Sequence, residues 1–132
     1  LFFVFKPQSK AEVVWELYSP SSVSLTQPQG KPVVMDFYAD WCIPCHELDA
    51  TTYRDERVVK ALEGFRRIKV DLTKEDDEAA QALVEAFEIE GVPTILFLGG
   101  NGEEIKPMRT AGYIGPDEFL LLLKAYESEL KK

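Results

Sequence analysis

The chain contains two cysteines, Cys42 and Cys45, in the segment "DFYADWCIPC" at residues 36–45. Their spacing corresponds to about one turn of a helix, so the pair cannot crosslink distant parts of a fold. Two thiols this close either form a reversible disulfide or supply half of a metal site. Because Pro44 suits the first turn of a helix, the sequence predicts a helix that begins at the cysteines and runs to about Ala50.

The expected place of Cys42 at the start of this helix gives it the properties of a nucleophile. Unpaired N–H groups and the partial positive charge of a helix N-terminus stabilise a thiolate, and they lower a cysteine pKa to roughly 3.5–7.5. Cys45 lies one turn further on, where we expect it to be less exposed than Cys42. The two positions predict that Cys42 attacks the disulfide of a protein partner and that Cys45 resolves the mixed disulfide.

A metal site is the competing interpretation of the same residues. Cys42, Cys45 and His46 offer three ligands, whereas a structural zinc site generally has four. The sequence contains no further Cys or His, so we favour the redox pair and expect neither a bound metal nor another cofactor. His46 itself is interpreted as a solvated helix residue, with a weaker role as a cation on the helix face of Cys42.

One charged residue, Asp36, interrupts the apolar run "VVMDFYA" at residues 33–39, which is typical of a central strand covered on both faces. We expect its side chain to point inward beneath the cysteine helix, where burial raises the pKa of a carboxyl group. Such an acid can take the proton of Cys45, through a water molecule, in the second exchange step. The alternative is a solvated Asp36 at a strand edge. Asp49, one turn beyond Cys45, can add a second negative charge, although we favour a solvated helix face.

Segments near the cysteines predict where a substrate peptide rests. Val92 and Pro93 lie at the start of another apolar run, and an X–Pro bond there can be cis and form a substrate-binding ridge. An apolar rim for an extended peptide is provided by three residues around the cysteines, Trp41, Ile43 and Pro44.

The 132 residues fit one structural domain, in which we expect residues 1–30 to form an N-terminal strand, helix and loop packed on a domain of residues 31–132. The net charge of −8 argues against nucleic acid, because phosphate binding depends on clustered Lys and Arg. No apolar run approaches the ~18 residues of a membrane-spanning helix, so we expect no membrane insertion by this chain. The apolar residues 1–5, "LFFVF", are interpreted as an edge strand or as the remnant of a removed membrane or signal segment.

The pattern of apolar residues and caps predicts an α/β fold. Helices are expected at residues 9–18, from Cys42 to about Ala50, after Asp55, after a cap formed by Thr73 and Asp76, and after Gly115. Strands are expected at residues 33–39 and 65–72 and, as a pair, within 91–113. Pro107 confines the second strand of that pair to a sheet edge. This order implies a central mixed sheet with helices on both faces.

These motifs together resemble the thioredoxin superfamily. "VVMDFYADWCIPC" is similar to the active-site strand and loop of that superfamily, "GVPT" to its cis-proline loop and "TAGYIG" to the glycine segment that follows. Over about residues 31–128 the chain is most similar to the C-terminal periplasmic domain of the DsbD family of membrane thiol:disulfide interchange reductases. That likeness lies in "GKPVVMDFYADWCIPCHELDATTYRDERVVKAL", "GVPTILFLGGNGEEI" and "AGYIGPDEFLLLL". The resemblance implies a thioredoxin fold.

The resemblance also implies roles for individual residues. Cys42 corresponds to the nucleophile, Cys45 to the resolving thiol, Asp36 to the buried acid, Pro93 to the cis-proline and Asp49 to an acidic tuning position. The implied function is a thiol–disulfide oxidoreductase of the periplasm, tethered to the membrane. It takes electrons from an upstream dithiol donor, such as a membrane domain of the same parent protein, and reduces protein disulfides, including those of cytochrome c biogenesis.

Pro44 of "CIPC" is also found at this position in thioredoxin itself, which leaves a second interpretation open. In that reading the chain is a free-standing thioredoxin-like disulfide reductase, with a cytoplasmic location as the alternative. A third reading is a non-catalytic thioredoxin-like binding module.

Overall fold

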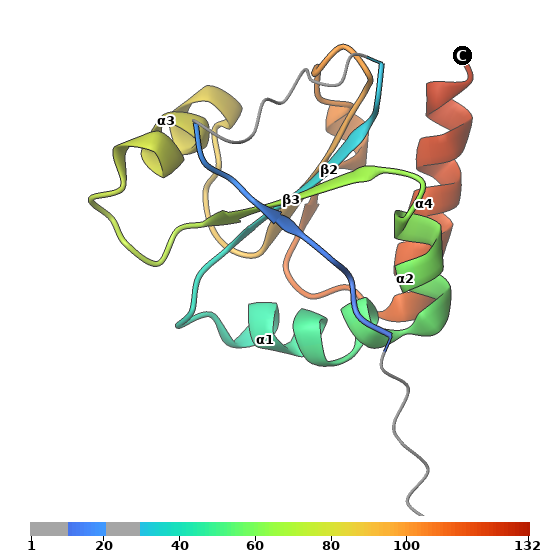
Figure 1. The fold of residues 1–132 in the computed structure, drawn as a ribbon, viewed down its shortest axis with the longest axis horizontal. Coiled ribbons are helices and arrows are strands. Elements are labelled where there is room, and N and C mark those ends of the chain that lie inside the picture. The colour runs from blue at the N-terminus through green and yellow to red at the C-terminus, as the bar shows by residue number, and fades with distance from the viewer. Residues whose placement is uncertain (1–10, 21–29) are drawn as a thin grey trace, which may run out of the picture.

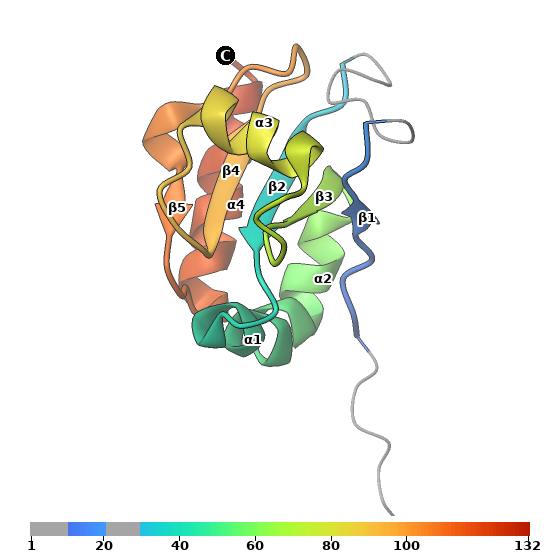
Figure 2. The same ribbon diagram turned by 90° about the vertical axis from the view of Figure 1, so that its left-hand side faces the viewer.

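The computed structural model describes residues 11–20 and 30–132, which form one five-stranded mixed sheet with helices on both of its faces (Figure 1). The strand order is β1-β3-β2-β4-β5, so β1 and β5 lie at the two edges (Figure 2). The strands are β1 (Glu16–Leu17), β2 (Val33–Tyr38), β3 (Arg66–Asp71), β4 (Thr94–Leu98) and β5 (Thr110–Ala111). The predicted α/β architecture with a central mixed sheet is confirmed.

The central strand β2 pairs in parallel with β3 on one side and antiparallel with β4 on the other. Every residue of β2 from Val33 to Phe37 is buried, including Asp36. Such continuous burial requires cover on both faces of the sheet, which explains why the sequence of this strand is almost uninterruptedly apolar.

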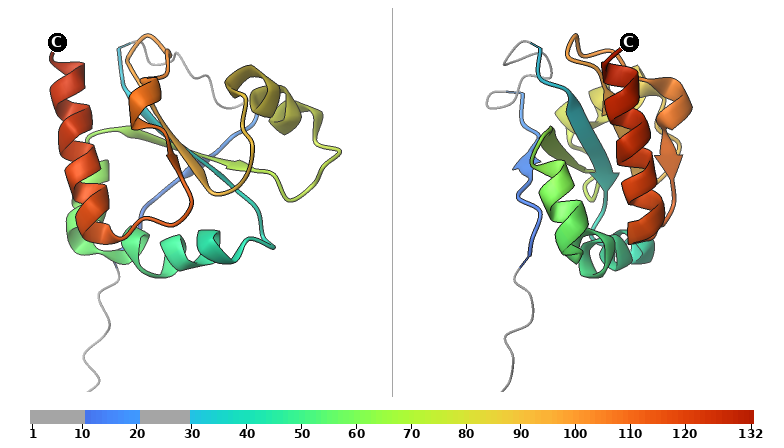
Figure 3. Two further views of the ribbon diagram at one scale, coloured as in Figure 1. Left: turned by 180° about the vertical axis from the view of Figure 1, so that it is seen from behind. Right: turned by 90° about the vertical axis from the view of Figure 1, so that its right-hand side faces the viewer.

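Helices α2 and α4 cover one face of the sheet, and α3 covers the other (Figure 3). Helix α1 follows β2 directly and lies across one end of the sheet, as Figures 1 and 2 show. The helices are α1 (Ile43–Ala50), α2 (Glu56–Leu62), α3 (Glu78–Phe87) and α4 (Pro116–Leu130), with short 3₁₀ turns η1 (Thr52–Arg54) and η2 (Lys106–Met108).

Among the described residues, one large apolar cluster lies on each face of the sheet. Alternate residues of β2 enter each cluster, with Val34 on the α2/α4 face and Val33, Met35 and Phe37 on the α3 face. This alternation follows from the two-residue period of a strand. Asp36 shares the parity of Val34, so its side chain belongs to the face covered by α1, α2 and α4.

Two helix starts test the predicted caps. Asp55 caps α2 as predicted, because its carboxylate accepts a hydrogen bond from the N–H of Arg57 at 2.9 Å. The predicted Thr73–Asp76 cap of α3 is wrong, because the side chain of Asp77 accepts from the N–H of Ala80 and α3 begins at Glu78. The Thr73 hydroxyl instead bonds to Asp71 and accepts from the backbone N–H of Asp40.

The predicted helix over residues 9–18 is wrong for the part that the structure describes. Residues 11–18 contain no helix, and Glu16–Leu17 form the parallel edge strand β1 beside β3. An ion pair between Arg66 of β3 and Glu16, with Nε and Oε2 2.8 Å apart, accompanies this pairing. The expected strand at residues 1–5 lies outside the described residues.

The last two strands differ in length. β4 has five residues and β5 only two, since Pro107 falls in η2 just before β5. The prediction that the second strand is an edge strand is confirmed. In the described segments 11–20 and 30–132, no helix combines the length and the apolar composition needed to cross a membrane.

Candidate functional site

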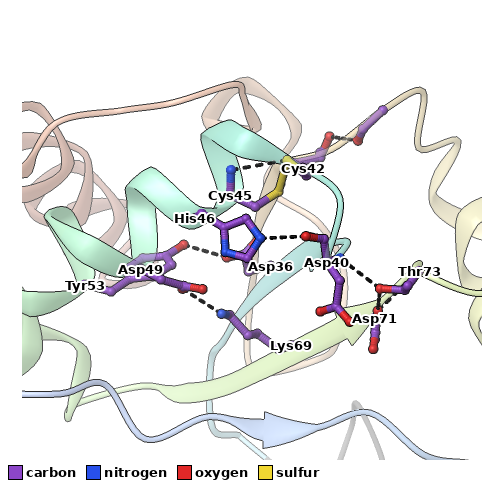
Figure 4. The surroundings of a disulfide bond; sticks show 12 residues. Asp36, Asp40, Cys42, Cys45, His46, Asp49, Tyr53, Lys69, Asp71 and Thr73 are labelled. Carbon is purple, nitrogen blue, oxygen red and sulfur yellow. Dashed lines mark hydrogen bonds and ion pairs between the residues drawn. A yellow bond between two sulfur atoms is a disulfide. The ribbon is translucent and has the colours of Figure 1, made fainter.

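Cys42 and Cys45 are joined by a disulfide at the start of α1, with their Cα atoms 5.3 Å apart (Figure 4). Cys42 is the N-cap of α1, and its sulfur accepts a hydrogen bond from the backbone N–H of Cys45 at 3.2 Å. Pro44 occupies the first turn of the helix, where a missing N–H removes no hydrogen bond. The predicted position of Cys42 at the helix N-terminus is confirmed. A thiolate at this sulfur would be stabilised by the N–H hydrogen bond and by the partial positive charge of the helix N-terminus.

The expected difference in exposure between the two cysteines is not found. Cys42 is 3% and Cys45 is 4% exposed in the disulfide-bonded state. The physical reason is a small apolar cluster in which both cysteines pack with Ala39, while Tyr38 and Val92 cover it. The prediction of a more exposed Cys42 is therefore wrong for the oxidised chain.

Apolar side chains beside the disulfide are nevertheless open to solvent. Trp41 is 68% and Ile43 is 71% exposed, on either side of Cys42 in the sequence. The Val92–Pro93 peptide bond is cis, and the carbonyl of Pro93 accepts a hydrogen bond from the N–H of Gly112 at 2.9 Å. This contact brings the segment after β5 next to the proline.

The loop before the cysteines is held by contacts with two other segments. The backbone N–H of Asp40 donates to the hydroxyl of Thr73 at 2.9 Å, and the carbonyl of Asp40 lies 2.5 Å from Nε2 of His46. His46 is exposed, as expected, but its ring contacts this carbonyl. Figure 4 shows these side chains around the N-terminal end of α1.

Asp36 is buried, as predicted, with only 2% of its surface exposed. Its Oδ2 accepts a hydrogen bond from the phenol of Tyr53 at 2.8 Å. Loss of hydration raises the pKa of Asp36 to about 7, although the Tyr53 hydrogen bond and the positive charge of Lys69 act in the opposite direction. A carboxyl group with this pKa can both accept and release a proton near neutral pH.

Three further side chains surround Asp36, and two of them were not predicted from the sequence. Asp49, a candidate from the sequence, forms an ion pair with Lys69, with Oδ1 and Nζ 2.7 Å apart. Lys69 and Tyr53 were not predicted. A predicted pairing of the strands at residues 33–39 and 65–72 would have identified Lys69, because it is the register partner of Asp36. Figure 4 shows all four side chains on the α1 side of the sheet.

Metal coordination finds no support in this arrangement. Across residues 11–20 and 30–132, no group of three or more His, Cys, Asp and Glu side chains is placed to hold a metal ion. The two cysteine sulfurs are bonded to each other. The nitrogen Nε2 of His46 faces a backbone carbonyl.

The chain is similar to known proteins over most of its length. Residues 20–127 match the family model described as a thioredoxin-like domain. The chain is 40% identical over 96 residues to the thiol:disulfide interchange protein DsbD of Yersinia pestis and 39% identical over 99 residues to that of Haemophilus ducreyi. These matches cover 73% and 75% of this chain but only 16% and 17% of the relatives. The chain thus spans about a sixth of the length of these curated relatives.

The chain also resembles solved structures, including one of the C-terminal domain of a DsbD protein. The C-terminal domain of Neisseria meningitidis DsbD in its oxidised form is 33% identical, with a TM-score of 0.62, and the match covers 74% of this chain and 79% of that one. A thioredoxin from Thermus thermophilus is 25% identical, with a TM-score of 0.73 and 90% of both chains covered. The chain has a thioredoxin fold and belongs to the thioredoxin-like family, together with the C-terminal domains of the DsbD thiol:disulfide interchange proteins.

Proposed function

We propose that this chain is a thiol–disulfide exchange domain that accepts electrons from an upstream dithiol and passes them to protein disulfides. The observation that carries the proposal is the disulfide between Cys42 and Cys45 at the N-terminus of α1, above the buried carboxyl group of Asp36. No cofactor is needed for this reaction, since the two cysteines themselves hold the electron pair.

The first step is an attack by the reduced chain on a partner. The thiolate of Cys42 attacks one sulfur of the partner's disulfide, a new bond forms between the two proteins, and the second partner sulfur leaves as a thiolate that takes up a proton. The N–H of Cys45 already points at the Cys42 sulfur in the oxidised chain. The same donor and the helix dipole favour the thiolate that the attack requires.

The second step releases the partner. The thiol of Cys45 gives its proton to Asp36, and its sulfur attacks the sulfur of Cys42. The disulfide of the chain forms again, the bond between Cys42 and the partner breaks, and the partner's sulfur leaves as a thiolate that takes up a proton from water. The partner has then gained two electrons, which the Cys42–Cys45 pair has lost. Reduction by the upstream dithiol reverses these steps and returns the proton from Asp36 to Cys45.

A substrate peptide has an apolar surface on which to lie. Trp41 and Ile43 are exposed beside Cys42, and the cis bond of Val92 and Pro93 lies in the loop that covers the cysteine cluster. We assign the positioning of the peptide to these residues and to Pro44. To Asp49 we assign an influence on the pKa of Asp36.

The similarity to DsbD proteins supports a larger setting for the domain. Because the chain spans about a sixth of those relatives, the upstream dithiol is proposed to lie in a membrane domain of the same parent protein. The domain would then face the periplasm on a membrane tether and serve periplasmic protein disulfides. We further propose one structural unit in which residues 1–30 pack on residues 31–132, as the pairing of β1 with β3 supports.

A free-standing thioredoxin-like reductase is the second candidate. It is supported by Pro44 between the cysteines and by the match to the Thermus thermophilus thioredoxin over 90% of both chains. The two candidates share the chemistry and differ in the electron donor. Reduction by a purified membrane domain with two cysteines, but not by a thioredoxin reductase, is the result that separates the relay domain from this candidate.

The direction of transfer is tested by equilibration with glutathione. Reduction potentials of related pairs run from about −270 mV in thioredoxin to about −120 mV in DsbA. A reductant must be almost fully oxidised in a glutathione buffer poised at about −200 mV, and alkylation of free thiols followed by mass spectrometry measures the fraction. A pair that remains reduced in this buffer would exclude the proposed direction.

A Cys42→Ser, Cys45→Ser protein that keeps full cellular function would favour the binding module instead.

A further inference from the structure

We propose that Tyr53 is a positioning residue of the exchange reaction: its phenol holds one oxygen of Asp36 and leaves the other for the proton of Cys45. The inference rests on the proposed function and adds a residue to it. No feature of the sequence near the cysteines marks Tyr53, which lies eight positions after Cys45, in the 3₁₀ turn η1.

The contact itself is short and buried. The hydroxyl of Tyr53 donates to Oδ2 of Asp36 at 2.8 Å, and the two residues are 3% and 2% exposed. The other oxygen, Oδ1, is buried and has no hydrogen-bond partner among the residues that the structure describes. One oxygen is thus fixed and the other is free to accept a proton. Hydrogen bonds from a neutral donor to a carboxylate favour the charged form of the acid.

The ring of Tyr53 is held from several sides. Trp15 from the N-terminal segment packs edge-on against it, with ring centroids 5.0 Å apart, and Phe119 of α4 does so at 6.0 Å. The neighbouring Thr52 donates its hydroxyl to the carbonyl of Ile114 at 2.6 Å, which ties η1 to the segment before α4. Such packing restricts the ring to one orientation, so the hydroxyl is directed at Asp36 before any partner binds.

The other charged groups around Asp36 do not replace this hydrogen bond. Lys69 of β3 lowers the pKa of Asp36, but its ammonium bonds to Asp49 of α1, whose charge raises that pKa. Helix α1 also brings the cysteines, while β4 presents Ile95 beside Asp36 and α4 presents the apolar ring of Phe119. Within the described residues, Tyr53 supplies the one hydrogen bond to the Asp36 side chain.

Tyr53 acts on the release step of the exchange. In the release step a proton leaves the sulfur of Cys45 and binds Asp36, and the electron pair of that sulfur forms the bond to Cys42. Asp36 accepts the proton only in its ionised form. The Tyr53 phenol stabilises that form, and burial raises its own pKa well above the usual value, so it stays a donor throughout the neutral range.

The test replaces Tyr53 by phenylalanine, which removes one hydroxyl and keeps the ring. Tyr126→Phe is the matched control, because this buried phenol donates to the backbone carbonyls of Val33 and Leu98 rather than to an acid. Each variant loses one buried hydroxyl group and keeps its aromatic ring. The Asp36 carboxyl carbon is titrated by NMR in the oxidised proteins, where no thiol titrates. We expect its pKa to rise by about one unit in Tyr53→Phe and to stay unchanged in Tyr126→Phe.

A second experiment on the same variants measures the exchange rates. The reduced proteins react with 5,5′-dithiobis(2-nitrobenzoate) in a stopped-flow instrument. The first release of thionitrobenzoate reports the attack of Cys42, and the second reports resolution by Cys45. A rise of one unit from a pKa near 7 reduces the ionised fraction of Asp36 at pH 7 about fivefold. We therefore expect the second release to slow about fivefold at pH 7 in Tyr53→Phe and to match the parent chain above about pH 9.

The outcomes separate the inference from the function on which it rests. An unshifted Asp36 titration in Tyr53→Phe, or a second release that slows equally at every pH or equally in Tyr126→Phe, overturns the inference. A shifted titration in a protein whose second release never occurs overturns the exchange function and leaves the Tyr53–Asp36 coupling supported.

Discussion

Asp36 and Lys69 are direct partners across β2 and β3, yet the ammonium of Lys69 bonds to Asp49 and not to Asp36. The ammonium is held among aromatic rings, with ring centroids of Tyr38, Trp15 and Tyr53 at 4.7, 5.6 and 5.8 Å from Nζ. A fixed cation close to Asp36 partly offsets the loss of hydration that raises its pKa. The cation therefore keeps the pKa of Asp36 near 7, so the carboxyl group is not permanently protonated.

Replacement of Lys69 by methionine is expected to raise the pKa of Asp36 above its value of about 7, because the change removes a positive charge that lowers it. Methionine keeps an unbranched apolar stem among the aromatic rings. NMR titration of the Asp36 carboxyl measures the effect. Lys60→Met, an exposed change on α2, serves as the control. A lower or unchanged pKa of Asp36 in Lys69→Met would refute the assigned influence of the cation.

The pKa of Asp36 also predicts how stability depends on pH. Its value is about 7 in the folded chain against an ordinary 3.8, so between these values the folded state binds more protons than the unfolded state. The free energy of unfolding therefore contains a contribution that is fully present below pH 3.8 and is lost as pH rises through about 7. The interval corresponds to about 4 kcal/mol.

Asp36→Asn removes this dependence, because the amide does not ionise. Urea unfolding of the oxidised proteins at pH 5 and pH 8 measures the difference between the two chains. We expect the variant to gain stability relative to the parent chain as pH rises, by a few kcal/mol at pH 8. An equal difference at both pH values would mean that Asp36 titrates normally in the folded chain.

Much of this fold follows from local sequence signals. The apolar run of β2 and Pro44 after Cys42 predict a strand followed by a helix, and both elements form within a residue of the expected positions. Asp36 is recognisable because a charge in a strand buried on both faces must lie inside. These signals depend on neighbours in the sequence.

Three of the wrong or missing predictions depend on contacts between distant segments. Residues 11–18 have helix-like spacing, but pairing with β3 makes Glu16–Leu17 a strand, with Val13 buried and Val14 exposed as in an alternating extended chain. Tyr53 reaches Asp36 only because η1 turns the chain back toward β2. Cys42 is covered by Val92, a residue fifty positions away. Local patterns carry no information on such contacts.

Trp41 is predicted to contribute to binding of protein substrates and not to stability, since it is 68% exposed. For Trp41→Ala we expect kcat/KM for reduction of a protein disulfide such as insulin to fall about tenfold, which is the scale of an aromatic contact at an interface. The rate with 5,5′-dithiobis(2-nitrobenzoate) should change little. Leu121→Ala, an exposed apolar residue on α4, is the control. An equal loss with both substrates would assign Trp41 to the chemistry instead of to partner binding.

The observed cap of α3 gives a stability prediction. Asp77→Ala removes the acceptor of the Ala80 N–H and should lower the free energy of unfolding by about 1 kcal/mol. Asp76→Ala changes an exposed neighbour and should stay within about 0.5 kcal/mol of the parent chain. Urea unfolding at pH 7 compares the two variants, and a larger loss for Asp76→Ala would reverse the assignment of the cap.

The division of labour between the cysteines is tested most directly by a pair of single variants. Reduced Cys45→Ser and Cys42→Ser proteins are mixed separately with insulin, and adducts are identified by peptide mapping under non-reducing conditions. We expect a stable mixed disulfide through Cys42 in Cys45→Ser and almost none in Cys42→Ser, because only the sulfur at the N-cap of α1 attacks a partner. No adduct through Cys42, or equal adducts through either cysteine, would contradict it.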